Sequence, residues 1–321
     1  MPHTPAHRRK CAIIGCGNVG ATVAYTYTMS GLFSEIVLID KDEKRARGEA
    51  LDLSHGLPFL SPLTVRAGDY PDLEGASLIV IAAGVGQREG ESRLELLSRN
   101  MRVFSSIVPH IVKYNREAIL LVVTNPVDIL TYYTMKLSGL PRGQVIGSGT
   151  VLDTARLKQL LGEYLRVDGR HVHTFIIGEH GDSELPVWTG SNISGIDLVD
   201  YFKLCGVCQD FSCVSGIFEE VRDAAYHIIE GKGATYYAVA QAVLRITQAI
   251  VRDENAVLPV SAYLDGEYGI RDLYLGVPSI VGAGGVKRVL EIPLSTDEML
   301  CLRASAKTVR DEINRVIATS V

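Results

Sequence analysis

K-C-A-I-I-G-C-G-N-V-G, residues 10–20, is the stretch that decides the predicted fold. Its apolar run, residues 11–14, indicates a buried strand, and three glycines then form G-x-G-x-x-G where this strand must turn into a helix. Gly15 permits a tight turn, Gly17 lets the backbone approach a pyrophosphate, and Gly20 allows the helix to pack closely on the strand. The helix N-terminus then offers unpaired N–H groups to phosphates, so the stretch predicts a dinucleotide-binding site.

A second apolar run, residues 36–39, ends in Asp40, twenty residues after Gly20. A carboxylate at this place accepts hydrogen bonds from an adenosine ribose and repels the extra phosphate of NADP. G-x-G-x-x-G on its own also occurs where a helix merely packs on a strand. The full order of strand, glycines, helix, strand and acid favours a dinucleotide, and the acid favours NAD.

Four further apolar runs predict strands of the same parallel sheet, at residues 63–67, 77–83, 118–124 and 145–146. Helical periodicity fills the intervals between them. The first half is therefore expected to be a doubly wound (Rossmann) α/β domain, which binds NAD and spans residues 1–149, with a flexible tail at residues 1–9.

After residue 149, long amphipathic helices lie beside short strands with glycine and proline turns between them. The strands are predicted at residues 274–275, 279–281 and 286–292. Ser295-Thr-Asp-Glu298 is a capping box that opens a C-terminal helix. This pattern predicts an antiparallel α+β substrate and catalytic domain at residues 150–321.

The composition is that of a soluble protein, with 47% hydrophobic and 21% charged residues and a formal charge of −5. No apolar run approaches the roughly 20 residues of a membrane span, and the N-terminus lacks the apolar core of a signal peptide, so we expect a cytoplasmic protein. The acidic balance argues against nucleic acid as a partner.

Cys205, Cys208 and Cys213 have a zinc or redox spacing, but no second pair completes a site, which favours ordinary reduced thiols and no metal.

Ligands of doubly wound sheets sit beyond the carboxyl ends of the strands, where two segments carry polar side chains. The first, residues 84–93, has three glycines, and Arg93 on such a hinged loop is a candidate lid cation, although a solvated loop is the simpler interpretation of its other charges. The second is Thr124-Asn-Pro-Val-Asp128. Asn125 is a candidate polar ligand, or only a helix cap with Pro126 at the first helical position.

A third segment, residues 147–182, contains the candidate proton-transfer group. Asp153 and Arg156 are three residues apart on a predicted helix and so share a face. Two simpler interpretations exist, because Thr150-x-x-Asp153 is itself a capping box and the ion pair could merely lie in solvent. His180 follows the apolar residues 175–177, where a strand end would expose an imidazole that titrates near neutral pH.

Six motifs in order resemble the L-lactate dehydrogenases of the bacterial type, in the lactate/malate dehydrogenase family. They are I-I-G-C-G-N-V-G, A-G-V-G-Q-R-E-G-E-S-R, T-N-P-V-D, L-D-T-A-R, I-I-G-E-H-G-D and A-T-Y-Y. The resemblance covers nearly the whole chain from Cys11. It implies a homotetramer of two-domain subunits that interconverts pyruvate and L-lactate with NADH and NAD, without a metal, in fermentative glycolysis.

The resemblance also implies the roles of the catalytic residues. His180 would be the acid/base, Asp153 would orient it, and Arg156 would hold the substrate carboxylate in a two-pronged salt bridge. Arg93 would polarise the substrate carbonyl from the lid, with Asn125 as a second donor.

Further positions follow from the same resemblance. Thr235 would line the substrate pocket, and Gln87 would face the substituent beyond the carbonyl. Lys158 and His173 match an allosteric site for fructose 1,6-bisphosphate, although Lys158 stands where the family usually has arginine. The expected NAD-binding residues are Gly15, Gly17, Val19, Gly20, Asp40, Tyr70, Gly84, Ser106, Val123, Asn125 and Ser148.

Three alternatives stay open at this point. A malate dehydrogenase shares the fold and the His, Asp and Arg residues but has an arginine six residues before the lid arginine, where this chain has Gln87. Another 2-hydroxy acid with a bulkier substituent is possible, because one sequence does not give the volume of a pocket. A non-catalytic NAD-binding protein would have lost His180, Arg93 or Arg156, and all three are present.

Overall fold

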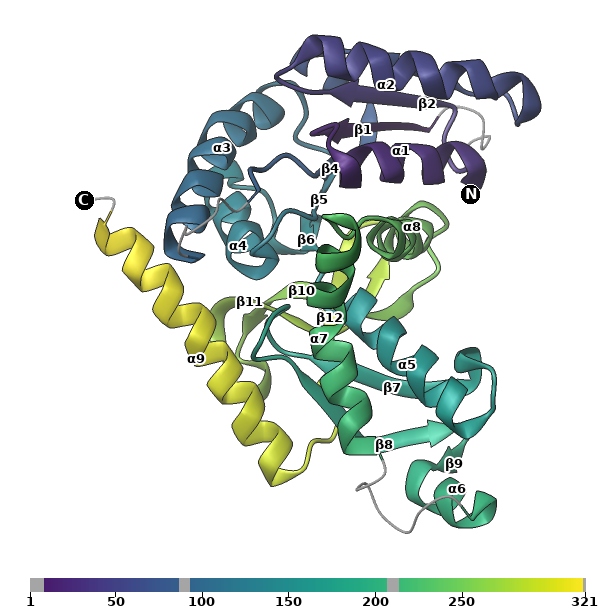
Figure 1. The fold of residues 1–321 in the computed structure, drawn as a ribbon. Coiled ribbons are helices and arrows are strands. Elements are labelled where there is room, and N and C mark those ends of the chain that lie inside the picture. The colour runs from purple at the N-terminus through teal and green to yellow at the C-terminus, as the bar shows by residue number, and fades with distance from the viewer. Residues whose placement is uncertain (1–8, 87–92, 207–213, 320–321) are drawn as a thin grey trace, which may run out of the picture.

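The computed structural model describes residues 9–86, 93–206 and 214–319, which form two halves around a shared sheet (Figure 1). Nearly all of the predicted tail lies outside these residues. The helices and strands of the first half are β1 (Lys10–Ile14), α1 (Asn18–Ser30), β2 (Glu35–Ile39), α2 (Glu43–Gly56), β3 (Thr64–Ala67), β4 (Ala76–Ile81), α3 (Arg93–Tyr114), β5 (Ile119–Val122), α4 (Val127–Ser138) and β6 (Val145–Gly147).

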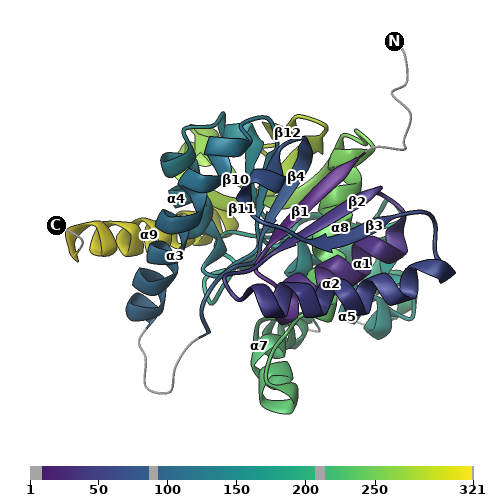
Figure 2. The same cartoon turned by 90° about the horizontal axis from the view of Figure 1, so that it is seen from above.

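These six strands are parallel and lie in the order β3-β2-β1-β4-β5-β6. Helices α1 and α2 cover one face of the strands, and α3 and α4 cover the other (Figure 2). The strand order reverses between β1 and β4, because β2 and β3 are added on one side of β1 and β4, β5 and β6 on the other. This place is the switch point of a doubly wound sheet, where ligands bind beyond the carboxyl ends of the strands. The predicted Rossmann arrangement is confirmed.

The second half contains a small antiparallel sheet, several helices and three further strands, of which two are long. Its elements are α5 (Val151–Leu165), β7 (Val172–Ile177), β8 (Leu185–Ile193), β9 (Ile196–Asp197), α6 (Leu198–Cys205), α7 (Ser215–Lys232), α8 (Tyr237–Val251), β10 (Ala256–Asp265), β11 (Arg271–Gly282), β12 (Gly285–Val289) and α9 (Thr296–Thr319). All pairings among its strands are antiparallel, as expected for an α+β region.

The prediction of separate strands at residues 274–275 and 279–281 is wrong, because both belong to the continuous β11. Gly276 and Pro278 do not break it. A Cβ at Gly276 would lie 2.7 Å from Thr150 Oγ1, so the glycine permits a close approach, and Pro278 pairs in register with Pro259 of β10. The third predicted strand ends earlier than expected, at Val289.

Among the described residues, one sheet of nine strands runs through both halves, a feature that the sequence did not predict. β10, β11 and β12 continue the parallel sheet beyond β6, and the joint is a single antiparallel pair, Ser261 with Gly147. A second connection joins the two sheets, where Gly178 at the end of β7 and Gly276 of β11 exchange both backbone hydrogen bonds, at 2.8 and 2.9 Å. The two halves are thus built on common backbone pairing.

Helix α9 crosses both halves along one side of the molecule (Figure 1) and contacts α3 and α4 as well as β8 and β11. The predicted capping box at its start is confirmed. The Ser295 backbone N–H donates to Glu298 Oε2 at 2.7 Å, and the Glu298 N–H donates to Ser295 Oγ at 3.2 Å. Within the described ranges, none of the helices has the length and apolarity that a membrane crossing requires.

Candidate active site

The centre of the candidate site is a pair formed by Asp153 and His180. Asp153 lies in the first turn of α5 and is 2% exposed, and its Oδ2 is 2.6 Å from His180 Nδ1. Its other oxygen, Oδ1, accepts a hydrogen bond of 2.8 Å from Arg156 Nη1. The carboxylate thus joins an imidazole and a guanidinium, which are 23% and 14% exposed. The interpretation of Asp153 and Arg156 as a pair in solvent is wrong, because the carboxylate is buried.

The predicted capping box at Thr150 is also wrong. The Thr150 side chain makes no cap bond and instead donates from Oγ1 to the Ile176 carbonyl at 2.6 Å, which ties the start of α5 to β7. The Thr150 N–H, which a capping box would bond to Asp153, donates instead to the Pro259 carbonyl at 3.0 Å, and the two Asp153 oxygens contact His180 and Arg156.

The backbone of His180 is fixed by a second buried carboxylate, which sequence reasoning had not singled out. Asp128 of α4 accepts the His180 N–H at Oδ2 over 2.8 Å and the Ser261 hydroxyl at Oδ1 over 2.5 Å. Asp128 is 2% exposed. Through these two hydrogen bonds Asp128 connects the T-N-P-V-D motif to the G-E-H-G-D motif and to β10. The only sequence signal for it was an aspartate directly before an apolar helical run.

The pKa values in this cluster favour a proton on the imidazole. Burial alone would lower the pKa of His180, but the charge of Asp153 and the hydrogen bond to it outweigh burial and raise the pKa to about 9. Burial opposes ionisation of Asp153, yet His180 and Arg156 keep its pKa below the usual range. Burial raises the pKa of Asp128 to about 6, against its hydrogen bonds from Ser261 and His180. A protonated histidine held by an ionised aspartate can donate a proton to a substrate oxygen.

Asn125 lies beyond β5 and is exposed. Its interpretation as a helix cap before Pro126 is wrong, because α4 begins at Val127 and Pro126 occupies the capping position, after a cis peptide bond. Asn100 of α3 links this loop to the one that follows β4. It donates to the Asn125 carbonyl at 3.0 Å and accepts the Val85 N–H at 2.8 Å. Sequence reasoning missed Asn100, which is almost fully buried.

The glycine loop has the geometry that a dinucleotide requires. Gly15 has φ of +98°, and a Cβ at Gly20 would lie 1.8 Å from the Gly15 carbonyl oxygen, so larger residues fit neither position. A Cβ at Gly17 would meet no atom within 4 Å, which leaves space in front of the N-terminus of α1. No side chain caps that terminus, so its N–H groups are available to phosphates.

Asp40 lies at the carboxyl end of β2, beside the glycine loop. It accepts the Cys16 N–H at 2.7 Å and the Asp42 N–H at 2.9 Å. These bonds fix the carboxylate at the place where it would accept hydrogen bonds from an adenosine ribose. The residues present therefore fit NAD.

Of the other cofactor candidates, Ser148 donates its N–H to the Val122 carbonyl at 2.9 Å, while the Tyr70 ring stacks on His110 with centroids 4.9 Å apart. The remaining candidates lie on the first turn of α1, beyond the ends of β4 and β5, and on α3, and are Val19, Gly84, Val123 and Ser106.

Several predicted residues are not joined to this cluster by the described contacts. Gln87 lies outside the described residues, and so does the side chain of Arg93, the first residue of α3. Thr235 is partly buried in the connection between α7 and α8. Lys158 on α5 is partly buried and His173 on β7 is exposed. Of the spaced cysteines, Cys205 is exposed, while Cys208 and Cys213 lie outside the described residues.

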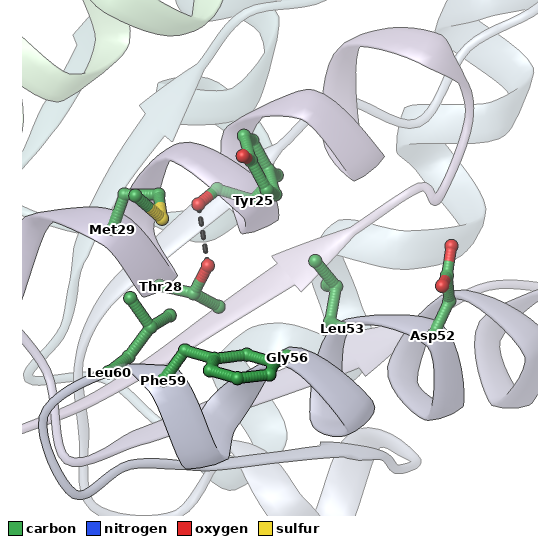
Figure 3. Close-up of a pocket in the computed structure, with 8 residues that line it drawn as sticks. All are labelled: Tyr25, Thr28, Met29, Asp52, Leu53, Gly56, Phe59 and Leu60. Atoms are coloured by element: carbon green, nitrogen blue, oxygen red, sulfur yellow. Dashed lines mark hydrogen bonds between the residues drawn. The ribbon is translucent and has the colours of Figure 1, made fainter.

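A cavity of about 460 Å³ opens between α1 and the end of α2, with none of the candidate site residues in its lining (Figure 3). Tyr25, Thr28 and Met29 contribute from α1, and Phe59 and Leu60 from the 3-10 helix Leu57–Phe59 and its end. The lining is largely apolar, and several of these side chains are more than half exposed.

Comparison with known proteins assigns both halves of the chain. Residues 9–147 match the model of the lactate/malate dehydrogenase NAD binding domain, and residues 150–320 match the α/β C-terminal domain of the same family. L-lactate dehydrogenase 1 of Clostridium acetobutylicum is 53% identical over 96% of this chain and 98% of its own length. The L-lactate dehydrogenase of Acetivibrio thermocellus is 52% identical over 95% and 96%.

Solved structures of lactate dehydrogenases superpose on nearly the whole chain. The minor L-lactate dehydrogenase of Enterococcus mundtii superposes with a TM-score of 0.94 at 38% identity, covering 97% of this chain and 99% of that one. A lactate dehydrogenase from a deep-sea metagenome of the Medee basin gives 0.94 at 41% identity with the same coverage. The chain therefore belongs to the lactate/malate dehydrogenase family, as an oxidoreductase whose cofactor is NAD.

Proposed function

We propose that this protein is an L-lactate dehydrogenase, which reversibly reduces pyruvate to L-lactate with NADH. The observation that carries the proposal is the Asp153 carboxylate, which lies 2.6 Å from His180 Nδ1 and 2.8 Å from Arg156 Nη1. One carboxylate thereby holds both an acid/base and an anion-binding guanidinium, as reduction of a 2-oxo acid requires. The L-lactate dehydrogenases that match nearly the whole chain support the same assignment.

In this mechanism NADH supplies the hydride, and the protein supplies position, charge and a proton. Arg156 holds the substrate carboxylate through paired hydrogen bonds, which places the substrate carbonyl beside the imidazole. His180 gives its proton to the carbonyl oxygen, and Asp153 stabilises the imidazolium before the transfer. Arg93 and Asn125 are the proposed donors to the developing oxyanion, and Thr235 lines the pocket. Asp40 and the glycine loop hold the adenosine end of the cofactor.

The assay that tests the proposal compares pyruvate, oxaloacetate and larger 2-oxo acids, with NADH and with NADPH. We expect the highest kcat/KM with pyruvate and NADH, because Asp40 would repel the phosphate of NADPH and the neutral Gln87 offers a second carboxylate no opposite charge. Gln87→Arg should change the ratio of the two kcat/KM values toward oxaloacetate by roughly a hundredfold or more, since a few kcal/mol separate a paired from an unpaired charge. A wild-type preference for oxaloacetate would instead indicate a malate dehydrogenase.

We further propose that the protein forms a homo-oligomer, a tetramer in keeping with the resemblance, in the cytoplasm. The support from the structure is the apolar surface around the cavity of Figure 3. Phe59 is 88% exposed, and Tyr25 and Met29 are each 57% exposed on the adjacent α1. Apolar patches of this kind are typical of contacts between subunits.

The proposal also includes allosteric activation by fructose 1,6-bisphosphate. Burial lowers the pKa of Lys158, and a lysine attracts phosphate without the two-pronged contact that an arginine makes. We therefore expect weak activation, with His173 as the second contact. Titration of the bisphosphate at low pyruvate tests this point, and a flat response in wild type and in Lys158→Arg would remove the site.

A further inference from the structure

Glu184 is a buried carboxyl group that the proposed proton transfer does not use. It follows His180 by four residues, directly before β8, where a turn closed by its N–H and the Gly181 carbonyl returns the chain toward α5. Glu184 is 7% exposed. One oxygen of Glu184, one of Asp153 and a ring nitrogen of His180 all lie within 4.8 Å of one another. Two carboxyl groups therefore lie close to the same imidazole.

The surrounding charges decide which of the two carboxyl groups keeps a proton. Asp153 contacts both cations of the cluster, His180 and Arg156, at 2.6 and 2.8 Å. Two carboxylates this close in a buried place do not both ionise at low cost, so the less well paired one stays neutral. Burial and the charge of Asp153 raise the pKa of Glu184 to about 9, against the opposing charges of His180 and Arg156.

The other acidic groups near His180 are already engaged. Asp128 reaches the cluster from α4 and is bonded to the His180 backbone and to Ser261. Glu179, which precedes His180, accepts a hydrogen bond from the Ser183 hydroxyl. Asp182, two residues after His180, accepts a hydrogen bond from the Tyr226 hydroxyl at 3.0 Å.

We propose that Glu184 is a positioning residue that keeps its proton at neutral pH and donates it in a hydrogen bond to the Asp153 carboxylate. The inference rests on the proposed function, because it deepens the role of the Asp153–His180 pair. A neutral acid holds Asp153 in place without a second negative charge beside His180. Such a charge would hold the imidazolium more tightly and make His180 a weaker proton donor.

The first test reads the proton itself, in the protein without cofactor. A protonated carboxyl group has an infrared C=O stretch that a carboxylate lacks, and difference spectra at pH 7 compare wild type with Glu184→Gln and Glu179→Gln. Glutamine keeps the shape and a donor but cannot ionise. The control, Glu179→Gln, removes a similarly buried carboxyl group from the same loop. We expect the acid band in wild type and in the control, and its loss in Glu184→Gln.

The second test reads the effect on the histidine. NMR titration of histidine ring carbons, with the His180 signal assigned by its loss in His180→Gln, should give a lower pKa for His180 in Glu184→Gln than in wild type. The reason is that Glu184 of the wild type becomes negatively charged in the pH range in which His180 loses its proton, and this charge raises the pKa of His180. Glu184→Leu, which removes the donor, should lower kcat roughly tenfold with KM for NADH unchanged, as expected for one lost hydrogen bond to a charged group.

The outcomes separate this inference from the proposed function. An active enzyme whose acid band at pH 7 is absent, or persists in Glu184→Gln, would overturn the role of Glu184 alone. Zinc that binds wild type and not Glu184→Gln in equilibrium dialysis would also overturn it, because the three atoms would then be ligands of a cation. Protein that shows the expected band but does not reduce pyruvate would overturn the proposed function and leave the neutral acid established.

Discussion

At the scale of the residue, the charge of Asp153 controls the proton on His180. Asp153→Asn removes the interaction that raises the pKa of His180 to about 9 and leaves the burial that lowers it. The imidazole should then be neutral at pH 7, and kcat for pyruvate reduction should fall by between about a hundredfold and ten-thousandfold, as when a histidine loses its orienting aspartate. Measured from pH 5 to 10, the alkaline limb of the kcat/KM profile should move to lower pH.

A matched control for this change is Asp168→Asn. Asp168 also pairs with an arginine, Arg170, at 2.6 Å, but both side chains are well exposed. Its kcat and pH profile should remain those of wild type. An alkaline limb that stays in place in Asp153→Asn would show that His180 takes its proton affinity from another group.

Arg156 illustrates why the geometry of a cation matters as much as its charge. Arg156→Lys keeps the charge but loses the planar fork that can bind the substrate carboxylate with two hydrogen bonds. We expect KM for pyruvate to rise by roughly tenfold to a hundredfold, equivalent to ~1.5–3 kcal/mol for a hydrogen bond between charged groups, with KM for NADH unchanged. Steady-state kinetics with each substrate varied in turn checks this. A larger effect on NADH than on pyruvate would place Arg156 elsewhere.

At the scale of the element, α9 supports the loop that carries His180. Ser305 on α9 is completely buried, and its Oγ accepts the Glu179 N–H at 2.8 Å. Ser305→Ala leaves this buried N–H unpaired, so the free energy of unfolding should fall by ~1–3 kcal/mol. Urea denaturation at one fixed protein concentration measures the loss.

Thr308→Ala on the same helix is the comparison, because Thr308 is exposed and its hydroxyl bonds only within the helix. It should change stability by less than about 0.5 kcal/mol. Equal stability of Ser305→Ala and wild type would contradict the proposed support by α9.

The elements differ in how far the sequence predicted them. β1, α1 and β2 were predicted from local signals, since an apolar run, a positive φ and a close helix contact each demand particular residues. β10 was not predicted, because Pro259 interrupts its pattern and its pairing with β6 joins segments that are more than a hundred residues apart. The extension of the parallel sheet through Ser261 and Gly147 was missed for the same reason.

The candidate site shows the same division. His180, Asp153 and Arg156 were identified from residue type, spacing and resemblance, and the structure brings these three together. Asp128 and Glu184 were missed. Their contacts depend on packing between segments from different parts of the chain, and an acidic residue beside an apolar run carries no local sign of burial.

At the scale of the whole molecule, the apolar surface on α1 and the 3-10 helix that follows α2 should mediate association. Phe59→Asp places a charge where the proposed contact is apolar, and burying it would cost several kcal/mol. Light scattering and sedimentation at micromolar concentration should show smaller species than wild type. Leu300→Asp changes another exposed apolar side chain, 59% exposed on α9, and should leave the assembly intact. Identical masses for all three proteins would exclude this surface as a contact.

The joint between β6 and β10 also has a consequence for the time course of synthesis. β6 is complete at Gly147, but the strand that covers its edge begins at Ala256, more than a hundred residues later. At ~5–20 residues per second, a ribosome needs about 5–20 s to make this interval. During that time the nascent parallel sheet has an uncovered edge strand, which invites pairing with other chains. The three residues of β6 keep that edge short, so the growing chain offers little backbone to a neighbour before β10 arrives.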